Sequence, residues 1–194
     1  MKDPAIRKIL RDTELSHFES DPNSLVLEEL SLPVAKARID MAVVNGSLHG
    51  YEIKSASDTL QRLPGQIEAY TKVFDYLSIV TEQKYSNRLV ELLPKWIGII
   101  VCDDDEKRGA TIHYRRKPKL NKRKEAFFLA KLLWHDEIVD VLEEYNIPFR
   151  KKDRTWLLCE ALSSSLDVET ISFVVRSKLK NRKGWKMNLK KAIH

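Results

Sequence analysis

The residues in this sequence best suited to chemistry are the carboxylate–lysine pair of Glu52-Ile53-Lys54 and an aspartate upstream of it, Asp40. The pattern Glu-x-Lys has little specificity, and it occurs again at Glu82-Gln83-Lys84. Only the first copy lies in an apolar stretch typical of a strand, whereas the second is surrounded by polar residues typical of a loop. Residues two apart on a strand project to the same face, so we expect Glu52 and Lys54 to point together.

The turn that precedes this strand decides whether Asp40 joins the pair. Asn45-Gly46-Ser47 separates two β-rich stretches and predicts a hairpin. A three-residue loop sets Val44 opposite Leu48, and counting back along the strands then sets Asp40 opposite Glu52. Directly opposed residues have Cβ atoms about 4.5–5.5 Å apart, close enough for two carboxylates to share a cation. A two-residue loop would shift the register and place the carboxylates on opposite faces.

Two like charges that face each other within an apolar strand pair are destabilising unless a cation compensates them. Mg²⁺ or Mn²⁺ suits such a site, because hard cations bind oxygen ligands. We expect Asp40, Glu52 and the backbone carbonyl of Ile53 to bind the metal. Lys54 would then assist the attacking water or stabilise the charge of the transition state. From the spacing alone, a surface ion pair, Asp40–Lys54 or Glu52–Arg38, is the simpler interpretation.

The elements that must position these residues follow from periodicity and from turn signals. We expect a helix at 4–19, strands at 24–30, 37–44 and 48–55, a helix at 58–76 that is interrupted near Pro64-Gly65, a strand at 77–80, a helix at 86–93, and strands at 96–102 and 110–115. Hairpins mixed with helical crossovers predict an α/β fold with a mixed sheet flanked by helices. Helical periodicity then returns at 125–145, 156–162 and 168–179, which predicts a helical C-terminal extension. Trp96, Trp134 and Trp156 lie in apolar periodic segments and are expected in the core.

The composition changes near residue 116, and we divide the chain into a core at 1–116 and a C-terminal region at 117–194. The second region begins with a basic linker, and its tail from Arg176 onward has eight Lys or Arg residues and no acid. The net charge of +6 and the pI of about 9.2 favour polyanionic partners. We expect phosphate contacts from four basic side chains: Arg62, which can instead pair with Asp58, and Arg182, Lys183 and Lys186.

The residues named so far carry a resemblance to a known family. The stretch ARIDMAVVNGSLHGYEIKSASDTLQRLPGQIEAYTKVFDYLSIV resembles the PD-(D/E)XK nuclease superfamily, and in particular a bacterial and phage branch with the pattern RID…GxEIKS…D…RL…Q…Y…FD. The resemblance covers residues 25–102, and the later stretch LAKLLWHDEIVDVL is also similar to that branch. It implies a restriction-endonuclease-like fold, metal-bound carboxylates at Asp40 and Glu52, and a catalytic lysine at Lys54. The proline that often precedes the aspartate is absent here, since Ile39 occupies that position.

The same resemblance implies further site residues. Gln66 and Tyr70 match the QxxxY motif of RecB-like and Cas4-like exonucleases, in which the helix beside the active site helps to hold the DNA strand and the metal shell. A spacing of four places both residues on one helix face. An additional acid from the element before the aspartate strand commonly joins such sites as a metal ligand. Glu29 fits that position best, with Glu28 and Glu14 as rivals.

Together these features predict a cytoplasmic Mg²⁺- or Mn²⁺-dependent nuclease, a hydrolase whose substrate is DNA and which can act as a homodimer. The sequence shows no signal peptide and no membrane-spanning stretch, and Cys102 and Cys159 lie in apolar runs typical of reduced, buried thiols. The five histidines are too scattered for a zinc site, and no glycine-rich phosphate loop occurs. The alternative is a non-catalytic nuclease-fold module that binds DNA or a protein in a phage or defence system. An RNA-cleaving toxin is a further rival.

Overall fold

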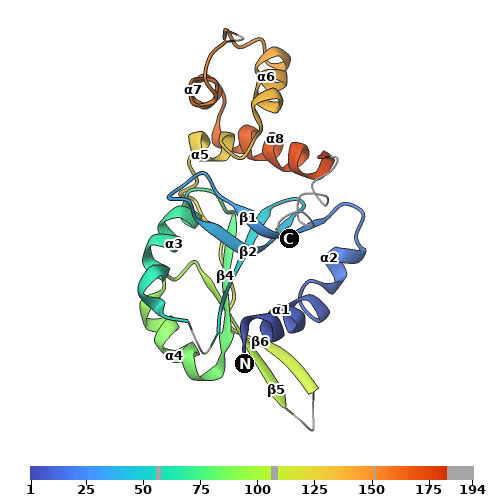
Figure 1. Cartoon of the computed structure of the whole chain (residues 1–194), viewed down its shortest axis with the longest axis vertical. Coiled ribbons are helices and arrows are strands. Elements are labelled where there is room, and N and C mark those ends of the chain that lie inside the picture. The colour runs from blue at the N-terminus through green and yellow to red at the C-terminus, as the bar shows by residue number, and fades with distance from the viewer. Residues whose placement is uncertain (56–57, 106–108, 151, 183–194) are drawn as a thin grey trace, which may run out of the picture.

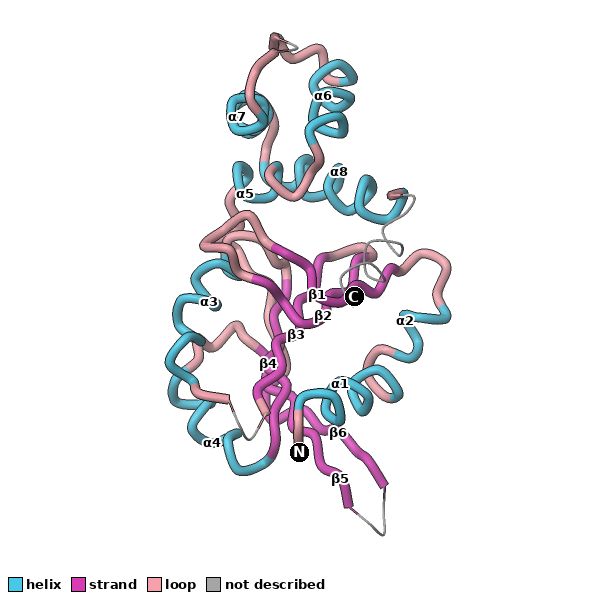
Figure 2. The backbone as a smooth tube through the Cα atoms, in the orientation of Figure 1, coloured by secondary structure: helices cyan, strands magenta, loops and turns pink. Residues whose placement is uncertain are grey.

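The structure, a computed structural model, describes residues 1–55, 58–105, 109–150 and 152–182. Its centre is a six-stranded sheet in which the strands lie side by side in chain order (Figures 1 and 2). The strands are β1 (Leu25–Ser31), β2 (Arg38–Val44), β3 (Leu48–Lys54), β4 (Tyr76–Glu82), β5 (Gly98–Asp105) and β6 (Gly109–Arg116). The β3–β4 and β4–β5 pairs are parallel and the other neighbours are antiparallel, so the sheet is mixed as predicted.

Helices cover both faces of the sheet and form a separate layer at one end of it (Figure 1). The helices before β6 are α1 (Asp3–Asp12), α2 (Ser16–Ser20), α3 (Leu63–Thr71), which a short 3₁₀ turn at Leu60–Arg62 precedes, and α4 (Gln83–Leu92). The C-terminal helices are α5 (Ala126–Ala130), α6 (His135–Glu144), α7 (Thr155–Ser165) and α8 (Val168–Asn181). The helices α3 and α4 are the crossovers that parallel strand pairs require. The predicted α/β class with a helical C-terminal region is therefore confirmed.

The central strands are buried on both faces, and alternate residues supply two separate cores. On β5, Ile99 and Val101 join the larger core, which includes α3 and the C-terminal helices. Ile100 and Cys102 of the same strand join the smaller core, in which Ile6 of α1 is buried. Because both faces are covered, polar chemistry is confined to the ends of the strands.

Three expected helices begin or end at other residues than predicted. The single helix expected at 4–19 is two helices, α1 and α2. The helix expected at 58–76 begins as α3 only at Leu63, because Pro64 fits the first turn of a helix and not its interior. The helix expected at 125–145 is interrupted between α5 and α6, where Trp134 is extended and its N–H donates to Oε2 of Glu137 at 2.8 Å. The apolar periodicity continues through this break and therefore conceals it.

The core prediction for the tryptophans is wrong at two positions. Trp134 and Trp156 are 48% and 49% exposed, because each lies at the beginning of an outer helix, α6 or α7. Trp96 packs partly buried against the larger core. Cys102 and Cys159 are buried and free, as expected. Within the described ranges, no helix is both long and apolar enough to cross a membrane.

The basic segment after β6 is bound to the sheet domain through two side chains. The Asn121 amide donates to the carbonyl oxygens of Thr71 at 2.6 Å and Phe74 at 2.9 Å. Lys124 forms an ion pair with Asp75 at 2.5 Å, and these two side chains are only 4% and 6% exposed. The end of α3 and the start of β4 therefore hold the chain that leads into the C-terminal helices.

Candidate active site

The β2–β3 hairpin has the register that the three-residue loop predicts. Val44 pairs with Leu48, and Met41 pairs with Tyr51. The turn is closed by Asn45, whose side chain accepts a hydrogen bond from the backbone N–H of Ser47 at 3.0 Å. Continuing this register from Met41–Tyr51 brings Asp40 level with Glu52.

Asp40 reaches from β2 to the backbone of β3. Its Oδ2 accepts a hydrogen bond from the N–H of Ile53 at 2.7 Å. Burial, and after it the nearby Glu52 carboxylate, raise the pKa of Asp40 from its ordinary value to about 7. The Ile53 N–H and the Arg7 guanidinium oppose this rise without cancelling it. Asp40 therefore titrates close to neutrality.

Glu52 is the point on which the polar side chains converge. Its Oε1 accepts from Lys54 Nζ at 2.6 Å and from Gln66 Nε2 at 2.7 Å, and its Oε2 accepts from the Tyr70 hydroxyl at 2.7 Å. Lys54 also donates to Gln66 Oε1 at 3.0 Å. Glu52 and Lys54 are only 2% and 8% exposed. The structure thus brings together the five residues proposed for catalysis, and it pairs Lys54 with buried Glu52, unlike either of the surface ion pairs considered from the sequence.

The helix α3 fixes Glu52 because Gln66 and Tyr70 lie one turn apart on the face that packs against β3. The Tyr70 hydroxyl also lies 2.9 Å from the Arg38 carbonyl, so its ring connects α3 with both strands of the hairpin. Burial raises the pKa of Tyr70, and the Glu52 charge adds to this effect. The hydroxyl therefore remains a donor to Glu52 over the whole ordinary pH range.

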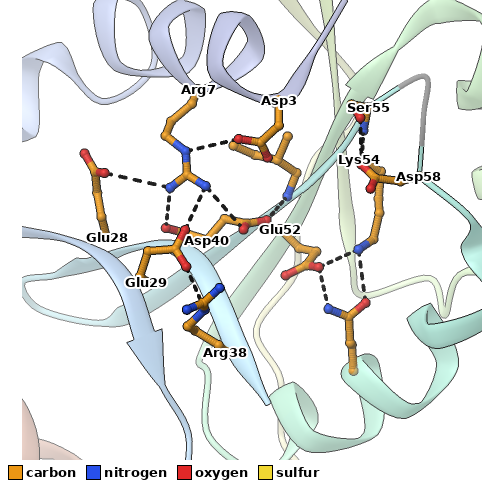
Figure 3. A network of polar contacts seen from close by, with 12 residues as sticks. Asp3, Arg7, Glu28, Glu29, Arg38, Asp40, Glu52, Lys54, Ser55 and Asp58 are labelled. Atoms are coloured by element: carbon orange, nitrogen blue, oxygen red, sulfur yellow. Dashed lines mark hydrogen bonds and ion pairs between the residues drawn. The ribbon is translucent and has the colours of Figure 1, made fainter. Parts of the chain in front are cut away.

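The Arg7 guanidinium, from α1, lies on the side of Asp40 away from Glu52 (Figure 3). Arg7 donates to the Asp40 carbonyl at 3.0 Å and to Glu29 Oε1 at 2.9 Å, and its Nε lies 3.4 Å from Asp3. Burial alone would lower the pKa of Arg7, but the surrounding carboxylates hold it above its ordinary value. No sequence pattern predicts this contact, because Arg7 is one of several polar residues on an amphipathic helix and its partners are distant in the chain.

Glu29, predicted as a further metal ligand, is paired with two arginines. Its two carboxylate oxygens are engaged by Arg7 at 2.9 Å and by Arg38 at 2.6 Å. Its rivals are also occupied, since Glu28 pairs with Arg11 and Glu14 accepts from the Tyr114 hydroxyl. Across the described residues, no three His, Cys, Asp or Glu side chains form a metal-binding group.

Asp40 and Glu52 nevertheless lie in one cleft of about 740 Å³. Its floor includes Ile53 and Lys54, and its walls include residues from α1, from the β1–β2 turn and from the 3₁₀ turn before α3. Two carboxylates and a carbonyl are a donor set that fits Mg²⁺ or Mn²⁺, which typically take one or two carboxylates and complete their shell with waters and phosphate. The raised pKa of Asp40 reflects its burial and then the nearby Glu52 charge, and a bound cation would offset both effects.

The predicted phosphate contacts differ in their surroundings. Arg62 is exposed and lines the cleft. Arg182 is remote from it, because its guanidinium pairs with Glu137 at 2.6 Å and lies 4.3 Å from the centre of the Trp134 ring, with its side chain only 3% exposed. The structure therefore does not favour a DNA contact at Arg182. Lys183 and Lys186 lie outside the described residues.

Comparisons with known proteins connect the whole chain to one family. The model of the family described as bacteriophage P4 protein cII matches residues 3–193. Protein cII of Enterobacteria phage P4 is 26% identical over 162 residues, which cover 82% of this chain and 60% of that protein. The matched part of the chain thus spans less than two thirds of the length of this relative. A protein of unknown function from Silicibacter pomeroyi aligns with a TM-score of 0.43 and 18% identity, over 60% of this chain and 71% of that one.

Proposed function

This chain belongs to the bacteriophage P4 protein cII family, and we propose that it is a metal-dependent nuclease of the PD-(D/E)XK type that hydrolyses phosphodiester bonds in DNA. The observation that carries the proposal is the convergence of Lys54, Gln66 and Tyr70 on buried Glu52, with Asp40 beside it. Burying two carboxylates in one cleft costs stability, and a protein that only binds DNA has no use for them. The match to the motif pattern supports the same function.

In this proposal Asp40, Glu52 and the Ile53 carbonyl hold Mg²⁺ or Mn²⁺. When bound, such a cation lowers the pKa of coordinated water and offsets phosphate charge. Lys54, at the floor of the cleft, provides a cation for the charge that develops on the phosphate oxygens. Gln66 and Tyr70 keep the Glu52 carboxylate in one orientation, so its position does not depend on the substrate.

The function is tested by incubating the wild type and Glu52→Gln with labelled single-stranded, duplex and branched DNA and with RNA, in Mg²⁺ or Mn²⁺. Glu82→Gln, in the second Glu-x-Lys copy, is a matched control outside the cleft. We expect cleavage of at least one DNA form by the wild type and by Glu82→Gln. Removing the Glu52 charge should lower the rate by roughly 10²-fold or more, as for other groups that position catalysis.

Other outcomes would exclude this function. Equal cleavage by all three proteins would place the activity outside the cleft. DNA binding without cleavage in either metal would favour the non-catalytic binding module, and cleavage confined to RNA would favour the ribonuclease. The oligomeric state needed for cleavage can be read from the dependence of the rate on protein concentration.

A further inference from the structure

Two residues that line the cleft, Ala35 and Lys36, have a left-handed backbone conformation. Four non-glycine residues in the described part of the chain have positive φ: Glu29, Ala35, Lys36 and Asn146. The first three belong to β1 and to the turn that joins it to β2. A residue with a side chain is strained in this conformation, because its Cβ crowds the neighbouring carbonyl oxygen. Strain of this kind persists when the rest of the structure or the function requires it.

The strain is concentrated in the turn 34–37. The N–H of Ala37 donates to the Val34 carbonyl at 2.9 Å, and Ala35 and Lys36 between them have φ of 50° and 51°. Two successive left-handed residues are the signature of a type I′ turn, which strongly favours Asn-Gly. This chain has Ala-Lys instead. The sequence therefore retains a turn whose residues suit it poorly.

The turn places a cation, Lys36, at the wall of the cleft. Ala35, Lys36 and Ala37 all line the cleft that contains Asp40 and Glu52. Lys36 is exposed, and among the described residues it has no ion-pair partner, whereas neighbouring Arg38 pairs with Glu29. On another wall of the same cleft, exposed Arg62 comes from the 3₁₀ turn. Exposed cations from two elements, Lys36 and Arg62, thus line the same cleft as the two carboxylates.

We propose that the turn 34–37 is a phosphate-binding element and that Lys36 is its contact residue for a nucleic-acid strand. The inference rests on the proposed nuclease function for the class of substrate. The ammonium group of a lysine binds a backbone phosphate as a point charge and releases a condensed counterion. Such a contact does not depend on base sequence. The left-handed backbone keeps the amine at the cleft wall, and the chain loses stability in exchange for that placement.

The experiment separates the charge of Lys36 from the strain of the turn. Lys36→Met removes the charge and keeps the strain, Lys36→Gly removes both, and Ala35→Asn relieves strain and keeps the charge. Lys95→Met removes an exposed charge that does not line the cleft and serves as the control. Each protein is measured for binding of fluorescein-labelled single-stranded and duplex DNA by anisotropy in EDTA at several salt concentrations, for Mn²⁺-dependent cleavage, and for its thermal midpoint.

We expect Lys36→Met and Lys36→Gly to bind DNA roughly 3- to 10-fold more weakly, with a salt slope smaller by about 0.7–0.9, the value of one phosphate contact. Ala35→Asn and Lys95→Met should bind as the wild type does. The thermal midpoint should rise by about 2–4 °C in Ala35→Asn and Lys36→Gly and stay unchanged in Lys36→Met.

Two results would overturn the inference, and they are distinguishable from failure of the nuclease. If the wild type binds and cleaves DNA but Lys36→Met has unchanged affinity and salt slope, Lys36 is not a phosphate contact. If neither Ala35→Asn nor Lys36→Gly is more stable than the wild type, the turn is not held at a cost to stability. If the wild type neither binds nor cleaves any nucleic acid, the proposed nuclease function is wrong, and the role of Lys36 that rests on it is wrong as well.

Discussion

Asp40 and Glu52 bring two negative charges into one cleft, and the protein compensates them in different ways. Glu52 receives three hydrogen bonds from Lys54, Gln66 and Tyr70, which together use both of its oxygens. Asp40 receives one backbone N–H at 2.7 Å and a longer contact of 3.4 Å from Arg7. The pKa of Asp40 therefore reflects its weaker compensation: burial and the Glu52 charge raise it to about 7.

Asp40 should make the metal-free protein less stable as the pH rises. Its pKa is about 7 in the folded chain and near its ordinary value of 3.8 in the unfolded chain. The folded state holds the Asp40 proton more tightly than the unfolded state does. The stabilisation from this proton is therefore complete below about pH 4 and is lost as the pH rises through about 7. Asp40→Asn keeps an oxygen for the Ile53 N–H and removes this dependence. In EDTA at pH about 8, we expect the free energy of unfolding of the variant to exceed that of the wild type by roughly 2–4 kcal/mol.

Denaturant unfolding of both proteins at pH about 5 and about 8 measures this difference, which should shrink at the lower pH. Added Mg²⁺ should stabilise the wild type at the higher pH and leave Asp40→Asn nearly unchanged. A wild type that is more stable than the variant at pH about 8 without metal would show that the Asp40 charge is fully compensated.

Sequence reasoning reached the centre of this site and missed its surroundings. Glu52, Lys54, Gln66 and Tyr70 share a strand or a helix face, and local spacing predicts such neighbours. The contact of Arg7 with Glu29 and Asp40 joins positions far apart in the chain, which no local pattern predicts. The same contact pairs Glu29, the predicted further metal ligand, with a cation.

At the scale of elements, the β2–β3 hairpin sets the site because its three-residue turn fixes the register. The turn residues predict the hairpin and leave two loop lengths open, and the pairing of Val44 with Leu48 shows the three-residue loop. The C-terminal helices were harder to delimit. The break between α5 and α6 depends on the hydrogen bond of Glu137 to the Trp134 backbone, and apolar periodicity carries no trace of it.

At Gly98 the chain after β6 packs closely against the sheet. A Cβ added there would lie 2.8 Å from Pro118 Cδ and 2.8 Å from Ser78 Oγ. Gly98→Ala must therefore displace the 117–125 segment or the strand, and we expect a loss of roughly 1–3 kcal/mol in the free energy of unfolding. Gly46→Ala is the control, because a Cβ there has no atom within 4 Å. Equal thermal midpoints for the two variants would contradict the close packing of this segment.

At the scale of the whole molecule, the sheet domain and the C-terminal helices are joined by buried charge. Asp75 accepts from the Leu48 N–H at 2.7 Å, pairs with Lys124 at 2.5 Å and lies 3.8 Å from Arg176 of α8. The change of composition near residue 116 lies at the end of β6, and the first C-terminal helix, α5, begins at Ala126. The composition did not reveal that a residue of the basic run, Lys124, is buried, because buried and solvated lysines look alike in a sequence.

Lys124→Met should be strongly destabilising, because it leaves the Asp75 carboxylate buried without its main partner. We expect a loss of roughly 3–5 kcal/mol, the usual cost of breaking a buried ion pair from one side. Lys119→Met, in the same basic run but exposed, should change stability by less than about 0.5 kcal/mol. Chemical denaturation of the full chain compares the two. A small effect of Lys124→Met would indicate that the segment is not held by this ion pair.

Whether the cleft is a nuclease site can be tested by comparing the lysines of the two Glu-x-Lys copies in the chain. Lys54→Met and Lys84→Met remove the same charge, from the floor of the cleft and from the exposed helix α4 respectively. Their rates of DNA cleavage in Mn²⁺ are measured at saturating enzyme. We predict a loss of roughly 10²-fold or more for Lys54→Met and a wild-type rate for Lys84→Met. Equal rates for the two variants would contradict the account.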